Sequence, residues 1–260
     1  MEEYTIRSAF AEDAQTLSDI YGYYVTNTAV TFEITPPSAE EIAERIARYT
    51  QKYPYLVIED DEDIIGFASA HAFRERPAYD FAAEVSIYLR HDARHQGYGK
   101  AVYTLLEQEL ARMGIHNLYA CIATSGYPDD PYLSTDSPRF HAALGYRQCG
   151  AFCNCGRKFD RWYHMIWMEK VIREPCDHPA PLIPYPTLIR DTRSDLQKLL
   201  SSYDEKVVRL ITKYGDLFYG EALHFCAEYG AHEFGREEEG LQLGATLCFL
   251  SEISHIEVIG

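Results

Sequence analysis

The fold is decided by the stretch EVSIYLRHDARHQGYGKAVYTLLEQEL, residues 84–110. Its first residues complete a strand predicted over 82–89, and its last residues belong to a helix predicted over 98–113. Between them, Gly97 and Gly99 allow the backbone to approach an anion without interference from a Cβ atom. The amides of this turn and the N-terminus of the helix together favour a bound pyrophosphate.

Two other glycine-rich phosphate motifs do not fit this turn. A dinucleotide fingerprint needs a third glycine at position 102, where the chain has Val102. A P-loop needs glycine at position 94 and Ser or Thr at position 101, where the chain has Arg94 and Ala101. On these residues alone, a helix start eased by glycine and without a ligand stays an alternative.

The composition limits the classes of partner. The 260 residues include 40 acidic and 24 basic ones and carry a net charge of -16, which argues against a nucleic-acid binder and against an anionic membrane surface. The first residues, MEEYTIRSAFAEDAQ, lack the apolar core of a signal peptide, and the late apolar run LGATLCFL is too short to span a bilayer. We therefore expect a cytoplasmic protein that binds neither nucleic acid nor membranes.

The cysteines predict reduced thiols. Seven of them are scattered through a chain that shows no secretion signal. Cys153, Cys155, Cys176 and His178 have a spacing that is not one of the strong zinc patterns, so no metal site is expected.

Residues 4–170 predict a mixed sheet with helices on its faces, an α/β (α+β) fold. The second predicted helix has Ser38 as its N-cap and Glu41 as the capping-box partner. The predicted order is strand 4–10, helices 11–25 and 38–53, a hairpin over 54–73, strand 82–89, helix 98–113 ending at Gly114, strand 116–123, helix 137–144 ending at Gly145, and two strands across 146–170.

The composition changes after residue 170. Five prolines in VIREPCDHPAPLIPYP favour an extended linker over 173–187, between a domain over 1–172 and an extension over 188–260. Helical spacing of apolar residues predicts helices at 194–215, 217–230 and 243–258 in this extension, whose role the sequence does not reveal. Its two E-x-x-H pairs, Glu221/His224 and Glu252/His255, resemble di-iron ligand spacing, but helix packing or dimer contact is the favoured interpretation.

Four separated motifs, in matching order over about residues 4–170, resemble one family. The stretch 84–110 looks like the acetyl-CoA motif of the GCN5-related (GNAT) acetyltransferases. FRERPAYDF (73–81), SPRFHAALGY (137–146) and CGRKFDRWYHMIWMEK (155–170) resemble the phosphinothricin N-acetyltransferase subgroup. The resemblance implies a mostly antiparallel sheet of about seven strands, splayed between the strand at 84–89 and the strand at 117–123. It also implies a homodimer.

The same resemblance implies that acetyl-CoA is the acyl donor and that no metal takes part. The pantetheine arm would lie in the split of the sheet, as an added strand with a helix-terminus anion site beyond it. The implied cofactor-binding residues are Ile87, Tyr88 and Leu89 for the arm, Ser137 beside it, and Arg94, His95, Gln96, Gly97, Tyr98, Gly99 and Lys100 for the pyrophosphate.

Glu84 and His141 are the catalytic candidates. Alternation places Glu84 on one strand face with Ser86 and Tyr88, where a carboxylate is costly unless it is paired or used. The resemblance makes Glu84 the general base, and a buried pair with an arginine is the alternative. It makes His141, four residues after Ser137, the group that protonates or hydrogen-bonds the CoA thiolate; a histidine of the core is the alternative.

The candidate acceptor residues are Arg74, Arg76 and Tyr79 of FRERPAYDF, with Phe32, Lys158 and Trp162 at matching family positions. One arginine guanidinium can bind two oxygens of a carboxylate or phosphinate group. The alternative is that Arg74 and Arg76 form surface ion pairs with Glu75 and Asp80. The loop TSGYPDDPYLSTDS (124–137) is longer than in the family, with Ser134 where an asparagine is usual, so Asp136 is expected to take part in rebuilt contacts.

The predicted function is transfer of an acetyl group from acetyl-CoA to the primary amine of a small molecule, by direct attack in a ternary complex. The expected acceptor is an amino acid or a phosphinothricin-like analogue. The alternative is a non-catalytic acyl-CoA-binding or regulatory module whose helical segment makes interactions.

Overall fold

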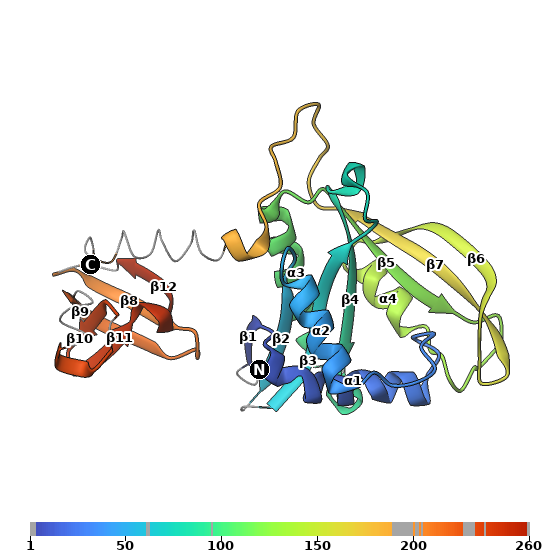
Figure 1. Cartoon of the computed structure of the whole chain (residues 1–260), viewed down its shortest axis with the longest axis horizontal. Coiled ribbons are helices and arrows are strands. Elements are labelled where there is room, and N and C mark those ends of the chain that lie inside the picture. Colours follow the sequence, from blue (N-terminus) through green and yellow to red (C-terminus); the bar gives the residue numbers. More distant parts are fainter. Residues whose placement is uncertain are drawn as a thin grey trace. The chain divides into compact units, whose positions relative to one another are not determined.

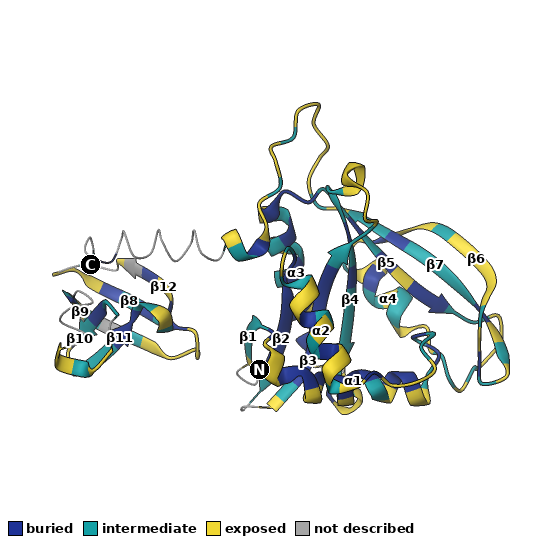
Figure 2. Ribbon diagram, viewed as in Figure 1, coloured by how far each residue is buried: buried dark blue, intermediate teal, exposed yellow. Residues whose placement is uncertain are grey.

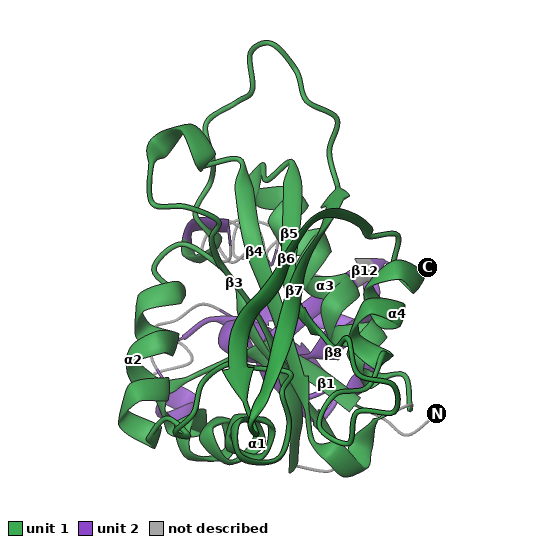
Figure 3. Cartoon of the chain, turned by 90° about the vertical axis from the view of Figure 1, so that its right-hand side faces the viewer, with its two compact units in different colours: residues 1–186 green, residues 187–260 purple. Residues whose placement is uncertain are grey.

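A seven-stranded sheet forms the centre of the first of two units, residues 1–186, and the second unit comprises residues 187–260 (Figures 1 and 3). The structure is a computed structural model that describes residues 4–60, 63–94, 96–188, 200, 203, 205–225, 232–236 and 238–258. Within these residues, no helix has the length and apolar character needed to cross a membrane.

The order of elements predicted for residues 4–170 is confirmed. The strands are β1 (Tyr4–Ser8), β2 (Tyr55–Asp60), β3 (Asp63–Ala72), β4 (Ala82–Leu89), β5 (Asn117–Thr124), β6 (Arg147–Lys158) and β7 (Arg161–Val171). They lie in the order β1-β2-β3-β4-β5-β7-β6, and only β4 and β5 are parallel. The helices are α1 (Ala14–Asn27), α2 (Ala39–Tyr49), α3 (Tyr98–Met113) and α4 (Asp136–Ala143).

Helices cover both faces of the sheet, with α2 and α3 on opposite sides (Figure 3). The strands β2 and β3 are accordingly buried on both faces, which Figure 2 shows as dark blue. One core cluster joins Leu17 of α1 and Ile42 of α2 to Val57 and Phe67 of the sheet. The predicted capping box is present, since the Ser38 hydroxyl accepts from Glu41 N–H at 3.2 Å and the Glu41 carboxylate accepts from Ser38 N–H at 2.8 Å.

The sheet splays where the sequence predicted it. The strands β4 and β5 pair only at Ala82↔Asn117, Ala83↔Leu118 and Glu84↔Tyr119. Residues 85–89 continue to pair with β3, whereas β5 continues to pair with β7. The two halves of the sheet therefore separate beyond Glu84, and each strand facing the gap has one edge without a strand partner.

The proline-rich segment packs against the first unit at its end. The Ile183 N–H donates to the Met113 carbonyl at 2.9 Å, and the Tyr185 N–H donates to the Lys52 carbonyl at 2.9 Å. Tyr185 is buried. The last residues of the expected linker over 173–187 are thus held at the C-terminal end of α3, and the first unit extends to residue 186.

The prediction of a helical extension over 188–260 is wrong. The second unit holds a five-stranded antiparallel sheet in the order β11-β10-β9-β8-β12. Its strands are β8 (Val207–Thr212), β9 (Leu217–Phe225), β10 (Gly240–Leu243), β11 (Thr246–Phe249) and β12 (Ile253–Val258). The predicted helix residues Leu196 and Leu199, and residues 226–230, lie outside the described residues.

Alternation explains the error. In β8, Val208, Leu210 and Thr212 are buried and the residues between them are more exposed, so a period of two controls the packing. The apolar residues of this stretch also fit helical spacing, and local pattern alone could not decide between the two. In a strand, Glu221 and His224 lie on opposite faces, so they cannot act as a helical ligand pair. Among the described residues, no group of three or more His, Cys, Asp or Glu side chains could hold a metal.

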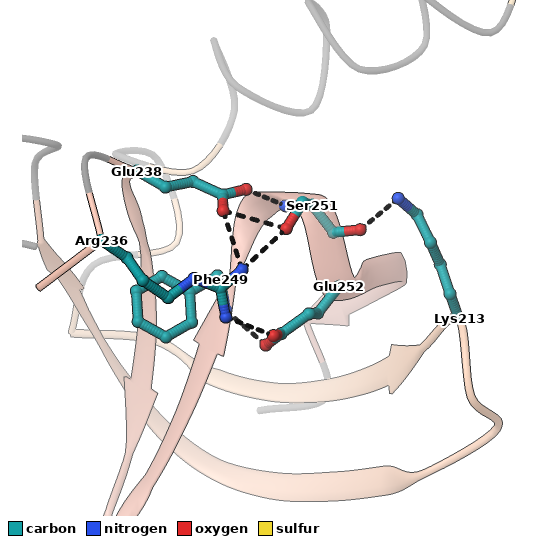
Figure 4. A network of polar contacts seen from close by, with 6 residues as sticks. All are labelled: Lys213, Arg236, Glu238, Phe249, Ser251 and Glu252. Carbon is teal, nitrogen blue, oxygen red and sulfur yellow. Dashed lines mark hydrogen bonds and ion pairs between the residues drawn. The ribbon is translucent and has the colours of Figure 1, made fainter. Parts of the chain in front are cut away.

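A polar network joins the segment before β10 to the turn before β12 (Figure 4). Arg236 pairs with Glu238 at 3.0 Å and with Glu252 at 2.5 Å, and its guanidinium lies 3.8 Å from the centre of the Phe249 ring. Glu238 accepts a hydrogen bond from the Ser251 hydroxyl at 2.9 Å. These contacts stabilise the turn Leu250–Glu252, which directs the chain back to β8.

Candidate active site

A cavity of about 580 Å³ opens beside β4, between the first turn of α3 and the first turns of α4. A smaller cavity adjoins it and is lined by residues on both sides of the split, among them Ser86 and Cys121. Ile87, Tyr88 and Ser137 line both cavities. The split in the sheet therefore continues outward into the space in front of α3.

The backbone of β4 faces the split at alternate residues. The Arg90 N–H donates to the Ile65 carbonyl of the β3 side at 2.7 Å. Because backbone direction alternates along a strand, Ile87 and Leu89 direct their main-chain groups to the opposite side, into the split. The backbone of Tyr88 faces β3, so Tyr88 lines the cavity only through its side chain.

Tyr24 hydrogen-bonds one of the main-chain groups that face the split, the carbonyl of Leu89. Its hydroxyl donates to the Leu89 carbonyl at 2.6 Å, and its ring is buried. The Leu89 carbonyl thus has a hydrogen-bond donor within the protein, while the N–H of Leu89 is directed at the split. The sequence analysis missed Tyr24, because residues 65 positions apart leave no local signal of such a contact.

The glycines of the turn before α3 have different roles. Gly97 has φ of 95°, a left-handed conformation that glycine adopts without strain. A Cβ atom on Gly99 would lie 3.2 Å from Leu89 and 3.4 Å from Phe140, so this glycine allows close packing of α3 against β4 and α4. The amides at the start of α3 and the side chain of Lys100 are left at the cavity.

The remaining residues of this turn divide into three groups. Arg94 lines the cavity and lies 3.8 Å from Asp136 of α4, and Gln96 is exposed. The Tyr98 side chain is buried and donates to Asp60, so only its main chain is placed to meet a phosphate. The predicted residue His95 lies outside the described residues.

Glu84 lies at the inner end of the split. It is paired with His71 of β3 and with Tyr119 of β5. Burial raises the pKa of its carboxyl above the ordinary value, while the neighbouring His71 and Arg74 lower it in part. A carboxylate with a raised pKa, one residue before the part of β4 that lines the smaller, inner cavity, is suited to accepting a proton near neutral pH.

His141 is buried and hydrogen-bonded at both ring nitrogens. Its Nδ1 lies 2.8 Å from the Ser137 carbonyl, which can only accept, so Nδ1 carries a proton. Burial lowers the pKa of this histidine and keeps it neutral, so Nε2 accepts from the Tyr103 hydroxyl at 3.0 Å. Because only Nδ1 carries a proton, His141 can donate to a ligand only after its bond to the Ser137 carbonyl opens.

Arg74 lies near Glu84 on an aromatic platform. Its guanidinium is 4.4 Å from the centre of the Phe73 ring and 5.6 Å from that of Trp167, and it donates to the Phe73 carbonyl at 2.6 Å. Tyr79 makes an edge contact with Phe73, and Arg76 is exposed at the start of the turn that contains Tyr79. The alternative partner Asp80 pairs instead with Lys52 at 2.8 Å.

Phe32 and Lys158 form a different cluster. The buried Lys158 amine donates to the Thr31 carbonyl at 2.9 Å, and burial lowers its pKa. The Phe32 ring lies 2.5 Å from where a Cβ atom on Gly156 would be. Both residues join the loop after α1 to the tip of the β6–β7 hairpin, where Trp162 is exposed. No contact among the described residues connects them to Glu84 or Arg74.

The long loop after β5 is ordered around Asp130. This carboxylate accepts from the Ser125 hydroxyl at 2.6 Å and from the Tyr132 N–H at 3.0 Å, and its side chain is 1% exposed. Ser134 at the end of the loop and Asp136 at the start of α4 line the cavity. Nearby, Cys121 is accessible from the split, and burial raises the pKa of its thiol to about 12, so it is not a thiolate.

Comparisons with known proteins agree with this geometry. The family described as "Acetyltransferase (GNAT) domain" matches residues 6–167. The phosphinothricin N-acetyltransferase of Streptomyces coelicolor is 32% identical over 172 residues, which cover 65% of this chain and 96% of that protein. The L-methionine sulfoximine/L-methionine sulfone acetyltransferase of Salmonella typhimurium is 28% identical over 178 residues, covering 68% of this chain and 98% of that protein.

A solved structure is similar over the same region. The GNAT superfamily phosphinothricin acetyltransferase of Sinorhizobium meliloti, in complex with AcCoA, is 34% identical. It superposes with a TM-score of 0.61, covering 70% of this chain and 98% of that protein.

Proposed function

This chain belongs to the GNAT acetyltransferase family, and we propose that the cleft beside β4 is where it carries out its reaction. The protein is an acetyl-CoA-dependent N-acetyltransferase that acts on the amine of a small molecule. The observation that carries the proposal is the end of β4–β5 pairing at Glu84, because it places a carboxylate of raised pKa at the inner end of a cleft with a glycine turn at its outer end.

The donor lies along β4. The main-chain groups of Ile87 and Leu89 hydrogen-bond the pantetheine arm, and the start of α3 binds the pyrophosphate. Arg94 and Lys100 add positive charge beside these amides. This arrangement directs the thioester to the inner cavity, which Glu84 adjoins.

Acetyl transfer proceeds by direct attack. Glu84 accepts a proton from the acceptor ammonium, and the free amine forms a bond to the thioester carbonyl carbon. A main-chain N–H of β4 stabilises the oxyanion, and the carbon–sulfur bond breaks while the nitrogen loses its second proton, which gives the amide and the CoA thiolate. His141 hydrogen-bonds this sulfur through its Nδ1–H once the bond to Ser137 opens, or passes the Nδ1 proton to it while Nε2, released from Tyr103, takes up the proton that the nitrogen loses.

The acceptor is an amino acid or an analogue that carries an acidic group. The relatives are named for phosphinothricin and for methionine sulfoximine, and Arg74 lies close enough to Glu84 to affect its pKa. The Arg74 guanidinium, as a neighbour of Glu84, can bind the acidic group of the acceptor while the acceptor's amine contacts Glu84. Arg76, Tyr79 and Trp162 remain candidates for the outer part of this site.

The experiment is a panel of amines with acetyl-CoA, followed by release of free thiol. We expect turnover with phosphinothricin-like amino acids and little with amines that lack an acidic group. Thiol release with no amine on the panel, despite tight binding of acetyl-CoA, would instead favour a non-catalytic acyl-CoA-binding module.

A homodimer is proposed through the edge strand β6. Phe152 is 53% exposed on β6 and Trp162 is 50% exposed on β7, and β6 has no further strand beside it among the described residues. Light scattering should give twice the monomer mass, and Phe152→Glu should shift the protein toward the monomer. Cytoplasmic location and the lack of nucleic-acid binding stay predictions of the sequence.

A further inference from the structure

We infer that Arg139 of α4 forms a separate subsite for the 3′-phosphate of CoA. This inference rests on the proposed placement of the donor. Coenzyme A carries a pyrophosphate and, on its ribose, a phosphomonoester. The start of α3 accounts for the first group, and the second needs a further cation on the wall of the outer cavity.

Arg139 lies on the wall opposite the turn that precedes α3. It lines the outer cavity together with Asp136 and Phe140, which share its region of α4. Residues three apart lie on one side of a helix, so Arg139 and Asp136 are neighbours on the cavity side. Asp136 in turn lies 3.8 Å from Arg94, which places the first turn of α4 across the mouth of the cavity from the anion turn.

Packing keeps this wall at a fixed distance from the turn. Phe140 would lie 3.4 Å from a Cβ atom on Gly99, and its ring makes an edge contact with the buried Tyr103 at 5.5 Å. Arg139 therefore projects from a helix that is anchored to α3, and not from a free loop. A cation held in this way loses less conformational freedom when an anion binds.

Among the described residues, Arg94 alone of the three cations that line the outer cavity has a side-chain partner, whereas Lys100 and Arg139 differ in position. Arg94 donates to the His91 carbonyl at 3.3 Å and pairs with Asp136. Lys100 lies in the first turn of α3, next to the amides that bind the pyrophosphate. Arg139 is exposed, and among the described residues its guanidinium has no ion pair or hydrogen bond, not even with the neighbouring Asp136.

The chemistry of Arg139 fits a phosphomonoester. A guanidinium presents a planar fork of N–H groups that binds two phosphate oxygens at once. In a protein with net charge -16, an unpaired arginine at the rim of an anion cleft offsets the repulsion that a dianionic group meets. Arg139 thus gives the donor site a preference for CoA over its 3′-dephospho form.

Calorimetric titration of CoA and of 3′-dephospho-CoA tests the inference. The wild-type protein should bind CoA about tenfold more tightly than 3′-dephospho-CoA. Arg139→Gln should lose this difference by weakening CoA alone, and Arg139→Lys should restore part of it. Lys100→Gln should weaken both ligands by a similar factor, because it acts on the shared pyrophosphate.

Arg48→Gln is the control for the change in net charge. Arg48 is exposed on α2, on the opposite side of the sheet, and its substitution should leave both affinities unchanged. Equal binding of both ligands to the wild type would overturn the subsite, as would an Arg139→Gln variant that keeps the difference. Failure of the wild type to bind either ligand would contradict the proposed function itself.

Discussion

Glu84 and Tyr119 form the last residue pair between β4 and β5, and the two strands separate immediately beyond them. The carboxylate thereby lies at the point where a closed sheet becomes an open cleft. It is buried enough to raise its pKa, and the next residue of the strand, Val85, lines the inner cavity. We therefore expect Glu84 both to raise the rate of acetyl transfer and to lower the free energy of unfolding at neutral pH.

Substitution Glu84→Gln should lower turnover by at least about a hundredfold while the affinity for acetyl-CoA stays unchanged. The raised pKa also sets the pH dependence, because only the ionised carboxyl accepts a proton. The wild-type rate should therefore rise with pH through this raised pKa. Steady-state kinetics and calorimetric titration of acetyl-CoA check both points, and full turnover in the variant would remove Glu84 as the base.

The same substitution should stabilise the protein at neutral pH. Since the pKa of Glu84 is higher in the folded state, its favourable contribution exists below the ordinary carboxyl pKa and is lost as pH rises through the raised value. Glu84→Gln removes this loss, so its advantage over the wild type should disappear in acid. Urea unfolding at a series of pH values measures the difference, and a variant less stable than the wild type at neutral pH would contradict the expectation.

Tyr103→Phe should cost about 1–3 kcal/mol of unfolding free energy, because Nε2 of the buried His141 loses its donor. The lowered pKa of His141 adds a pH dependence of defined sign. Stability from the neutral imidazole is present above the ordinary histidine pKa and is lost as pH falls through that value toward the lowered one. In the His141→Asn variant, this loss of unfolding free energy as pH falls should be absent, which urea unfolding at a series of pH values measures. If the variant shows the same loss, another group causes it.

Lys158→Met should reduce the unfolding free energy by about 1–3 kcal/mol, since it leaves the Thr31 carbonyl without its donor. Lys52→Met is the matched control, because the half-exposed Lys52 pairs with Asp80 and lies over the Tyr53 ring, contacts worth about 1 kcal/mol or less each. Urea unfolding compares the two variants. If Lys158 binds the acceptor directly, its substitution will raise the KM for the amine and leave stability as it was.

Arg236→Gln should destabilise the second unit by about 1 kcal/mol, because Arg236 joins Glu238 and Glu252 and covers Phe249 (Figure 4). Acetyl transfer should be unchanged, since the residues of the proposed active site all lie in the first unit. Calorimetric scans should show only one of two transitions moving. A loss of activity in this variant would connect the second unit to catalysis.

The sequence was sufficient to predict an element where the residue's own backbone preference, or a contact with a residue nearby in the chain, decides the structure. The boundaries of α3 follow from Gly97 and Gly114, which both have a positive φ, and the start of α2 follows from the Ser38–Glu41 capping box. Alternation was correct for β4, because one face of that strand packs against α3 and the other against α1.

The extension shows where such signals fail. Apolar residues of 194–215 fit both a helix and a strand, and the choice depends on whether partners such as β9 and β12 are available to pair with β8. Those partners come from distant parts of the sequence, and pairing of this kind has no local signature.

The sequence by itself determined the family, the donor, the order of elements in the first unit and the identity of Glu84 as the candidate base, because each depends on motifs or on spacing along the chain. Only the tertiary structure decided the direction of side chains. It turned Tyr98 away from the cleft, engaged Lys158 with Thr31 and enclosed His141 between Ser137 and Tyr103. It also placed Arg139 at the rim of the outer cavity, without a partner in the part of the chain that the structure describes. The physical reason is that a side chain's free groups depend on which distant donors and acceptors folding brings beside it.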